Sequence, residues 1–289
     1  MSRFFARLGH LVSALLFIPW FKLEGITIPG TEIGIQPFGI LVATGVLAGM
    51  RLAEWHGARL GLRRDLVSDL ATHVVIIGFI FGHMFDMILY YPEKVLERPW
   101  ELLMIWTSLS SYGGFFGAAL GAFYWKWKRK LPMFALFDQV AFGLPLGWFF
   151  GRLGCFVVHD HPGSITDFFL AVDNFPYNGV IGPRHDLGFY EVLWSALVVP
   201  LFLFLDRWPR PHGFWIGLIC VLYAPVRFGL DFLREADRTY DGLTPGHYSS
   251  ILTLALGIWS FYLAYKKPTK PLPPALFASS VTATGEQVA

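Results

Sequence analysis

Long apolar runs separated by short polar connections dominate the chain from residue 37 onward. A helix needs about 20 apolar residues to cross the hydrocarbon core of a bilayer, and seven runs approach that length. They are Pro37–Leu52, Leu70–Tyr90, Tyr112–Trp127, Phe134–Val158, Phe189–Leu205, Phe214–Phe232 and Tyr248–Tyr265. The pattern predicts an all-α fold, a polytopic membrane bundle of about seven transmembrane helices with a head or loop region outside the membrane.

Composition supports a membrane location for most of the chain. Apolar residues make up 54% of it and charged residues 15%, whereas soluble domains carry about 25% charge. Lipid must therefore cover much of the surface. The net charge is only +2 and no basic tract is interleaved with aromatics, so no nucleic acid partner is expected. Cys155 and Cys220 both lie in apolar runs and form neither a disulfide framework nor a CxxC metal pattern.

The distribution of Lys and Arg predicts the orientation of the bundle. The connections after the first, third, fifth and seventh runs hold more than half of the 23 basic residues. Basic connections stay in the cytoplasm, so the N-terminus is expected outside and the C-terminus inside. This arrangement requires an odd number of spans, which agrees with seven.

One transmembrane domain is expected over residues 1–267. Met1–Trp20 resembles a signal peptide, but no small-x-small cleavage site follows, so we expect a retained interfacial or re-entrant segment within residues 1–34. The outer loop at 157–187 is polar, rich in turn residues and longer than a plain connector. The tail at 268–289 is rich in Pro, Ser and Thr and is expected to be disordered.

Arg152, Arg227 and Asp231 have apolar residues on both sides and fall at the depth where charge is most costly. Insertion of a charge at the bilayer centre costs at least ~2.5–3.5 kcal/mol, so Arg152, Arg227 and Asp231 must face a partner or a cavity. Tyr223, Arg227 and Asp231 are spaced by four and share one helix face, with Arg234 one turn beyond. Two arginines in a bundle bind phosphate well, because guanidinium is bidentate and stays charged. The residues thus predict action on an anionic lipid or anion near the outer leaflet; the alternative is that Arg227 and Asp231 only neutralise each other.

Further polar and small residues extend this candidate site. His83 and Asp86 lie one turn apart and could form either a catalytic base pair or a structural hydrogen bond. Gly147, Gly151 and Gly154 recur at about one-turn intervals around Arg152. Small residues at such spacing allow close approach of a backbone or a lipid headgroup.

Four stretches, in this order and spacing, resemble the prolipoprotein diacylglyceryl transferase family, over about residues 35–265. They are Ser111-Tyr-Gly-Gly-Phe-Phe-Gly, Gly151-Arg-Leu-Gly-Cys-Phe, Phe189-Tyr-Glu and Tyr223-Ala-Pro-Val-Arg-Phe-Gly-Leu-Asp-Phe-Leu-Arg-Glu. The resemblance implies a multi-pass protein of the bacterial inner membrane, with its N-terminus and the 157–187 loop periplasmic and its tail cytoplasmic. It implies transfer of diacylglyceryl from phosphatidylglycerol to the lipobox cysteine of a preprolipoprotein, the first step of lipoprotein maturation, without metal or organic cofactor.

The resemblance also implies residue roles. Arg152 and Arg227 would hold the phosphate of the leaving group, and Asp160 and Asp231 stand where the family has functional glutamates. The implied catalytic set is completed by Tyr112. The implied substrate-binding residues, besides Arg152, are Gly154, Cys155, Gly113, Gly114, Tyr223, Arg234, His83, His185 and Glu191.

Several polar positions depart from the family pattern. Tyr112 stands in place of a histidine that is often proposed as base, and tyrosine, with a reference pKa near 10, is a poor base. Cys155 replaces an asparagine, Phe38 a tyrosine and His83 an arginine. The group that accepts the thiol proton would then be His83, His185, a histidine of the outer loop, or water.

These departures leave two main hypotheses. The first is an active, divergent transferase. The second is a catalytically altered paralogue that binds phosphatidylglycerol or uses another acceptor, as a binding or regulatory protein. A transporter of anions or lipids is disfavoured because the sequence has no inverted pair of broken helices. Cys155 as a covalent nucleophile is disfavoured because the family reaction is a direct transfer.

Overall fold

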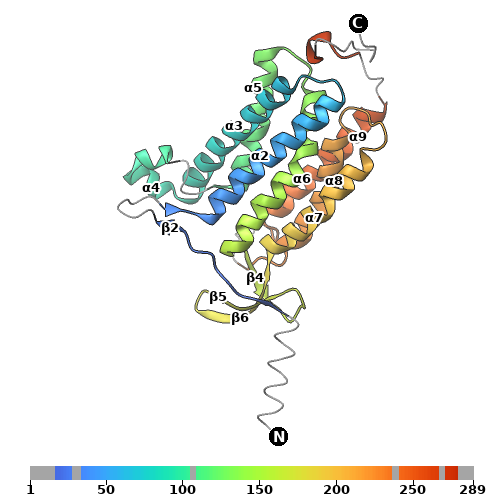
Figure 1. The fold of residues 1–289 in the computed structure, drawn as a ribbon. Helices are drawn as coiled ribbons and strands as arrows, with labels where there is room; N and C mark the ends of the chain where they lie inside the picture. The colour runs from blue at the N-terminus through green and yellow to red at the C-terminus, as the bar shows by residue number, and fades with distance from the viewer. Residues whose placement is uncertain (1–16, 28–33, 105–108, 236–240, 267–270, 279–289) are drawn as a thin grey trace. The chain divides into compact units, whose positions relative to one another are not determined.

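The computed structural model describes residues 17–27, 34–104, 109–235, 241–266 and 271–278, without the side chains of residues 35, 89, 90, 111 and 112. The long helices are α2 Pro37–Arg59, α3 Arg64–Tyr90, α5 Ser111–Arg129, α6 Met133–Val158, α7 Leu187–Leu205, α8 Phe214–Asp231 and α9 Pro245–Lys266 (Figure 1). Within the described residues, six of them are long and apolar enough to cross a membrane: α2, α3, α6, α7, α8 and α9. The prediction of a polytopic helical membrane protein is confirmed, although α5, at the third predicted run, is not among the six.

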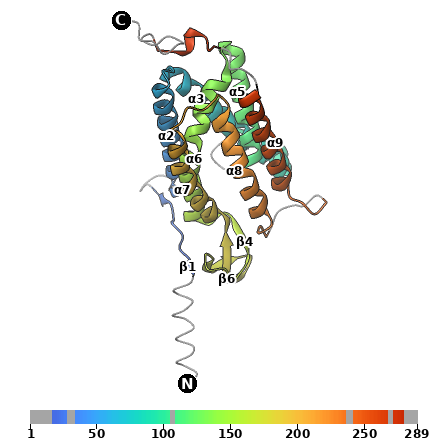
Figure 2. The same cartoon turned by 90° about the vertical axis from the view of Figure 1, so that its right-hand side faces the viewer.

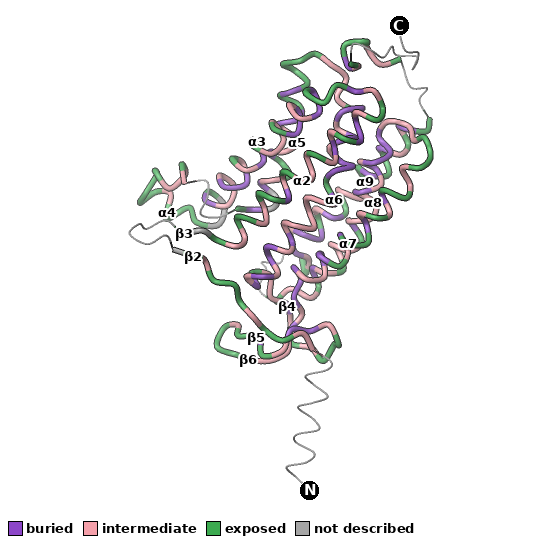
Figure 3. Tube along the Cα trace, in the orientation of Figure 1, coloured by how far each residue is buried: buried purple, intermediate pink, exposed green. Residues whose placement is uncertain are grey.

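The chain divides into two compact units. The first comprises Met1–Leu47, Pro145–Leu205 and Leu222–Leu254, and the second comprises Ala48–Leu144, Asp206–Val221 and Ala255–Ala289. Exposed and buried residues alternate along the helices of each unit (Figure 3). Each unit is described by itself below.

The first unit contains a small sheet that the all-α prediction missed. Its strand order is β1-β5-β6-β4, where β4 is Pro162–Ile165, β5 Val172–Tyr177 and β6 Val180–Asp186 (Figure 1 and Figure 2). Tyr177 pairs with Val180 across the two-residue turn Asn178-Gly179, in which both residues have positive φ. Asn-Gly is the pair that such a hairpin turn favours, because both residues tolerate that conformation. The loop at 157–187 is therefore a folded head.

The N-terminal segment contributes to this head. Strand β1, Ile18–Pro19, pairs in parallel with β5 at Val172 and Asp173. Strands β2, Ile26–Thr27, and β3, Gly34–Ile35, pair with each other in antiparallel fashion. The described part of the segment that was expected to be interfacial or re-entrant therefore forms short strands. Residues 1–16 lie outside the described part.

Close packing of α3 against α5 organises the second unit. A Cβ added at Gly113 or Gly117 would come within 2.5 Å of the carbonyl oxygens of Phe81 and Ile77, so only glycine permits this approach. The short helices α4, Pro92–Glu97, and η1, Pro99–Leu103, follow α3.

Part of the C-terminal tail packs in the core of the second unit. Residues 271–278 contain the short helix η2, Pro274–Leu276, and Leu276 is fully buried in a cluster with Leu70, Trp125 and Leu136. Phe277 forms a backbone bridge with Leu62. The expectation of a disordered tail is therefore wrong for these eight residues, because one apolar side chain fills a place in the core.

Candidate functional site

Glu191 lies at the centre of the ionic cluster in the first unit. It is in the second turn of α7 and is fully buried. Its Oε2 accepts hydrogen bonds from Trp148 Nε1 at 2.9 Å and Tyr223 Oη at 3.0 Å, and lies 2.9 Å from Arg152 Nε. Its Oε1 lies 3.6 Å from an Nη of Arg227. One carboxylate thus meets both arginines that the sequence singled out.

Arg152 is buried near the end of α6 and has partners on several sides. Its guanidinium lies 5.0 Å from the ring centre of Trp148, one helical turn earlier, in a cation–π contact. One Nη lies 3.2 Å from Nε2 of His161 and 3.8 Å from the sulfur of Cys155. The sequence predicted that Arg152 faces a partner or a cavity, and Glu191 on α7 is a partner.

Arg227 approaches Glu191 from α8. Its other Nη lies 2.7 Å from Oδ1 of Asp231, one turn later on the same helix. The mutual neutralisation considered from the sequence is therefore real, but it is part of a larger network. Below, Arg152 and Arg227 are called the guanidinium pair.

A contact between α8 and the start of α9 holds Asp231. Thr244 Oγ1 donates to the Asp231 carboxylate, and Thr244 also caps α9, accepting from the backbone N–H of His247 at 3.4 Å. A Cβ at Gly246 would collide with the same carboxylate. His247 Nδ1 lies 3.9 Å from Asp231. The sequence analysis missed Thr244 and His247, although Thr-Pro is a recognisable helix start.

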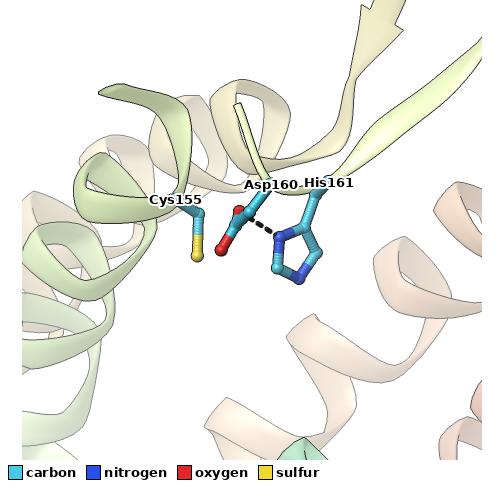
Figure 4. Close-up of side chains that lie close together, drawn as sticks. All are labelled: Cys155, Asp160 and His161. Carbon is cyan, nitrogen blue, oxygen red and sulfur yellow. Dashed lines mark hydrogen bonds and ion pairs between the residues drawn. The ribbon is translucent and has the colours of Figure 1, made fainter. Parts of the chain in front are cut away.

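Cys155, in the last turn of α6, gathers with Asp160 and His161, which follow the helix (Figure 4). The Asp160 carboxylate bonds to Nδ1 of His161, whose Nε2 faces Arg152. One ligand atom from each of the three residues lies within 4.8 Å of the others, so among the described residues this group could hold a metal ion. Asp160 is thereby linked to Arg152 through His161, which the sequence analysis had included only as one of the loop histidines.

Buried hydrogen bonds and ion pairs stabilise the head. His159 Nδ1 and Asp186 Oδ2 are 2.6 Å apart and both residues are buried. Asp186 also accepts from the backbone N–H of Phe189 at 2.9 Å, which caps the start of α7. Arg184 is buried and paired with Glu235. These contacts fix the start of α7, and hence Glu191, against the end of α6.

Three further predicted substrate-binding residues of this unit make contacts elsewhere in the structure. His185 bonds to Tyr190 Oη at 2.7 Å, and burial lowers the pKa of its imidazole. Arg234 follows the end of α8, where its backbone bridges Gly163. Gly154 packs on α2, because a Cβ there would lie 3.0 Å from the ring of Phe38. Their roles stay predictions.

The remaining predicted residues belong to the second unit. His83 is buried and its Nε2 lies 2.9 Å from the carbonyl oxygen of Glu101. Gly113 serves the packing of α5 on α3, whereas a Cβ at Gly114 would meet nothing within 4 Å. The side chain of Tyr112 lies outside the described ones. Participation of these residues in one site with the guanidinium pair stays a prediction.

Comparison with known proteins supplies independent information. A family model described as prolipoprotein diacylglyceryl transferase matches residues 26–263. The chain is similar to the phosphatidylglycerol–prolipoprotein diacylglyceryl transferase of Janthinobacterium sp., with 30% identity over 234 residues, 76% of this chain and 86% of the relative. The proteins of the same name from Acinetobacter baumannii and Allorhizobium ampelinum are each 29% identical, over 85% and 93% of this chain and 94% and 99% of the relatives.

Proposed function

Because the chain belongs to the prolipoprotein diacylglyceryl transferase family, we propose that it transfers diacylglyceryl from phosphatidylglycerol to the lipobox cysteine of preprolipoproteins. The observation that carries this proposal is the convergence of two guanidiniums on the single carboxylate of Glu191: that of Arg152 on α6, which is buried, and that of Arg227 on α8, which is largely buried. Such a pair suits a phosphate-bearing lipid better than a neutral one.

The reaction places new charge on the phosphate. The cysteine sulfur attacks the glycerol carbon of the diacylglyceryl group, so that a C–S bond forms and the C–O bond to phosphate breaks. The electron pair leaves with the phosphate oxygen, and a phosphodiester with one negative charge becomes glycerol phosphate, which carries more. Groups that stabilise this added charge lower the barrier rather than only tightening lipid binding.

Glu191 has a positioning role in this proposal. An arginine offers five N–H donors, and Glu191 engages only part of those of Arg152 and Arg227. The carboxylate therefore aligns the guanidinium pair while leaving donors for a phosphate. Preorganised donors of this kind need no rearrangement when charge develops. Asp231, held by Thr244, does the same for Arg227.

We place the site near the periplasmic face of the bacterial inner membrane. The end of α6, the start of α7, the end of α8 and the start of α9 supply its residues. The basic connections lie at the opposite ends of these helices, and basic connections remain in the cytoplasm. The 157–187 head is then periplasmic, where the lipobox cysteine of an exported preprolipoprotein is accessible.

The proposal is tested with purified protein in liposomes that contain labelled phosphatidylglycerol and a lipobox peptide. Arg152→Ala or Arg227→Ala should lower the transfer rate by about 10²–10³-fold or more, since each removes a stabiliser of the leaving charge. Arg51→Ala is the matched control, because that arginine has a side chain 80% exposed, and it should leave the rate unchanged. Tyr112→Phe tests the proposed catalytic hydroxyl in the same assay.

The second hypothesis has a distinct outcome. A wild-type protein that binds phosphatidylglycerol liposomes but yields no thioether product would be a lipid-binding paralogue. Complementation of a bacterial strain depleted of its own transferase provides the cellular version of the same test. Growth with wild type but not with Arg152→Ala supports the transferase.

A further inference from the structure

We propose that His161 is the base that takes the proton from the acceptor thiol, and that Asp160 is its positioning residue. The inference rests on the proposed transferase function. It assigns the step that is left open because Tyr112 stands in place of a histidine. Asp160 and His161 follow the end of α6, where they lie beside Cys155 (Figure 4).

The hydrogen bonds of His161 define which of its ring nitrogens is basic. An ionised carboxylate only accepts hydrogen bonds, so Nδ1, which contacts the Asp160 carboxylate, carries the hydrogen. A guanidinium only donates, so Nε2, which lies 3.2 Å from an Nη of Arg152, presents its lone pair. The basic nitrogen of a neutral imidazole is therefore directed at the guanidinium pair, next to the proposed phosphate site.

The same contacts decide between proton transfer and metal binding in this cluster. The ligand atoms of Cys155, Asp160 and His161 lie within 4.8 Å of one another, which by distance alone would suit a metal ion. Both ring nitrogens of His161 are already engaged, however. The guanidinium that bonds to Nε2 also lies 3.8 Å from the Cys155 sulfur, so a positive group stands where a cation would have to bind. The arrangement is instead that of a carboxylate that holds an imidazole in one tautomer for proton transfer.

The backbone at the end of α6 fixes this pair of residues. His159 has a φ of 51°, in the left-handed region that reverses a chain at a helix end. The N–H of Asp160 then bonds to the carbonyl oxygen of Cys155 at 3.4 Å. The side chains of Asp160 and His161 are 39% and 18% exposed. The imidazole is thus held in one place and can still exchange its proton with water.

Two other histidines considered from the sequence are engaged elsewhere. Nε2 of His83 lies 2.9 Å from the carbonyl oxygen of Glu101, so that nitrogen is a donor. Nδ1 of His185 lies 2.7 Å from the hydroxyl of Tyr190. His161 contacts the guanidinium pair directly, and a base must lie within hydrogen-bond reach of the proton that it removes.

The charges around the imidazole suit a base that becomes cationic during the reaction. The charged and titratable groups that face it are Asp160, Arg152 and Cys155, together with Glu191 on α7. Two carboxylates and one guanidinium leave the positive charge that His161 gains compensated. A lipid phosphate that takes the Arg152 N–H also releases Nε2 for the thiol, which couples deprotonation to lipid binding.

The transfer then balances without a further reactant. The S–H bond breaks and its proton goes to Nε2 of His161, while the sulfur forms a bond to the glycerol carbon. The C–O bond to phosphate breaks, and its electron pair leaves with the phosphate oxygen. His161 gives its proton to the released phosphate or to water, which restores the neutral imidazole.

The variant His161→Gln tests the base in the liposome assay. Glutamine keeps an acceptor for Arg152 but is not basic. A free thiol with a pKa near 8.5 is only about 3% ionised at neutral pH, so the rate at about pH 7 should fall about thirtyfold or more. The KM for phosphatidylglycerol and the thermal unfolding should stay at their wild-type values. His212→Gln, the same change in the second unit, is the matched control and should transfer at the wild-type rate.

The pH profile and the acceptor distinguish a base from a structural residue. Between about pH 7 and about pH 8.5 the wild-type rate should change little, whereas the rate of His161→Gln should rise about tenfold per pH unit as the thiol ionises by itself. A lipobox peptide with selenocysteine in place of cysteine is already ionised at neutral pH. With that peptide the difference between His161→Gln and wild type should largely disappear.

The role of Asp160 is tested by two substitutions. Asp160→Asn removes the charge that holds Nδ1–H and stabilises the imidazolium, so it should slow transfer to the cysteine peptide by about tenfold or more. Asp160→Glu keeps a carboxylate and should recover most of the rate. Both effects should shrink with the selenocysteine peptide, as expected of a residue that acts through His161.

Each outcome decides the inference. Equal rates and equal pH profiles of wild type and His161→Gln would overturn it, while the transferase function would stand. A slow His161→Gln that remains slow with the selenocysteine peptide, or that has a raised KM for phosphatidylglycerol, would also overturn it, because His161 would then only hold Arg152. Wild-type protein that yields no thioether product at any pH would refute the proposed function and the base together.

Discussion

Replacing Glu191 by glutamine tests the idea that one buried carboxylate holds both arginines. Glutamine keeps the shape and can still accept hydrogen bonds from Trp148 and Tyr223, so the change removes little besides charge. Glu191 is fully buried, 2.9 Å from Arg152 Nε and 3.6 Å from an Nη of Arg227. Opposite charges about 4 Å apart attract by ~4 kcal/mol at an effective dielectric constant near 20. Removing one partner of a buried pair costs about 3–5 kcal/mol, because the other charge is left uncompensated.

We expect Glu191→Gln to lower the free energy of unfolding by about 3 kcal/mol, the lower end of that range, because Asp231 still pairs with Arg227. For a chain of this size that corresponds to a fall in Tm of roughly 6–12 °C, measured by thermal unfolding in detergent. Glu54→Gln is the matched control. Glu54 also pairs with an arginine, at 3.0 Å, but that arginine is exposed, so the loss should be below ~1 kcal/mol.

The double variant Glu191→Gln/Arg152→Met shows whether the loss is electrostatic. Removing Arg152 as well eliminates the uncompensated charge, so the double variant should be more stable than the sum of the single effects predicts, by about 1–3 kcal/mol. Strict additivity, or a fall in Tm no larger than that of Glu54→Gln, would refute the reasoning that these residues form one coupled ionic cluster.

Three further predictions follow from single contacts. Gly246→Ala should displace the Asp231 carboxylate and slow transfer about tenfold or more, whereas Gly229→Ala, where a Cβ meets nothing within 4 Å, should transfer at the wild-type rate. Leu276→Ala should lower the free energy of unfolding by about 2–5 kcal/mol, measured as a lower Tm, since the side chain is fully buried. An unchanged Tm would contradict the placement of Leu276 in the core. Burial lowers the pKa of His185 in the folded protein, so the unfolded chain takes up a proton at this residue more readily. The contribution of the neutral imidazole to the free energy of unfolding is therefore complete above pH ~6.5 and is lost as the pH falls below that value. Hydrogen exchange of the head at about pH 7 and about pH 5 should therefore show less pH dependence in His185→Gln than in wild type.

Local signals in the sequence predicted the parts of the site that lie within one helix. Arg227 and Asp231 are four residues apart, and helix geometry alone brings them together. The same rule could have identified Trp148, four residues before Arg152, as its cation–π partner. The Asn178-Gly179 hairpin was also readable from the chain, but the expectation of helices alone concealed it.

Contacts between segments needed the tertiary structure. Glu191 was one of nine further residues assigned to substrate binding. Its neighbours in the sequence do not indicate that its carboxylate lies between two arginines. Thr244 lies 13 residues after Asp231 and outside its helix, so their contact could not be derived from helical spacing. The proposed roles of Tyr112, Gly113, Gly114 and His83 stay predictions.

The sequence by itself determined that this chain is a multi-pass helical membrane protein and that Arg152, Arg227 and Asp231 need partners at membrane depth. These conclusions depend on apolar run length and on the cost of burying a charge, which are properties of single segments. The tertiary structure decided that Glu191 is the shared partner, that the 157–187 loop contains a sheet, and that Leu276 belongs to the core. Those outcomes depend on which surfaces of distant segments meet, and helical or strand periodicity specifies a face of a segment but not the face that packs against it.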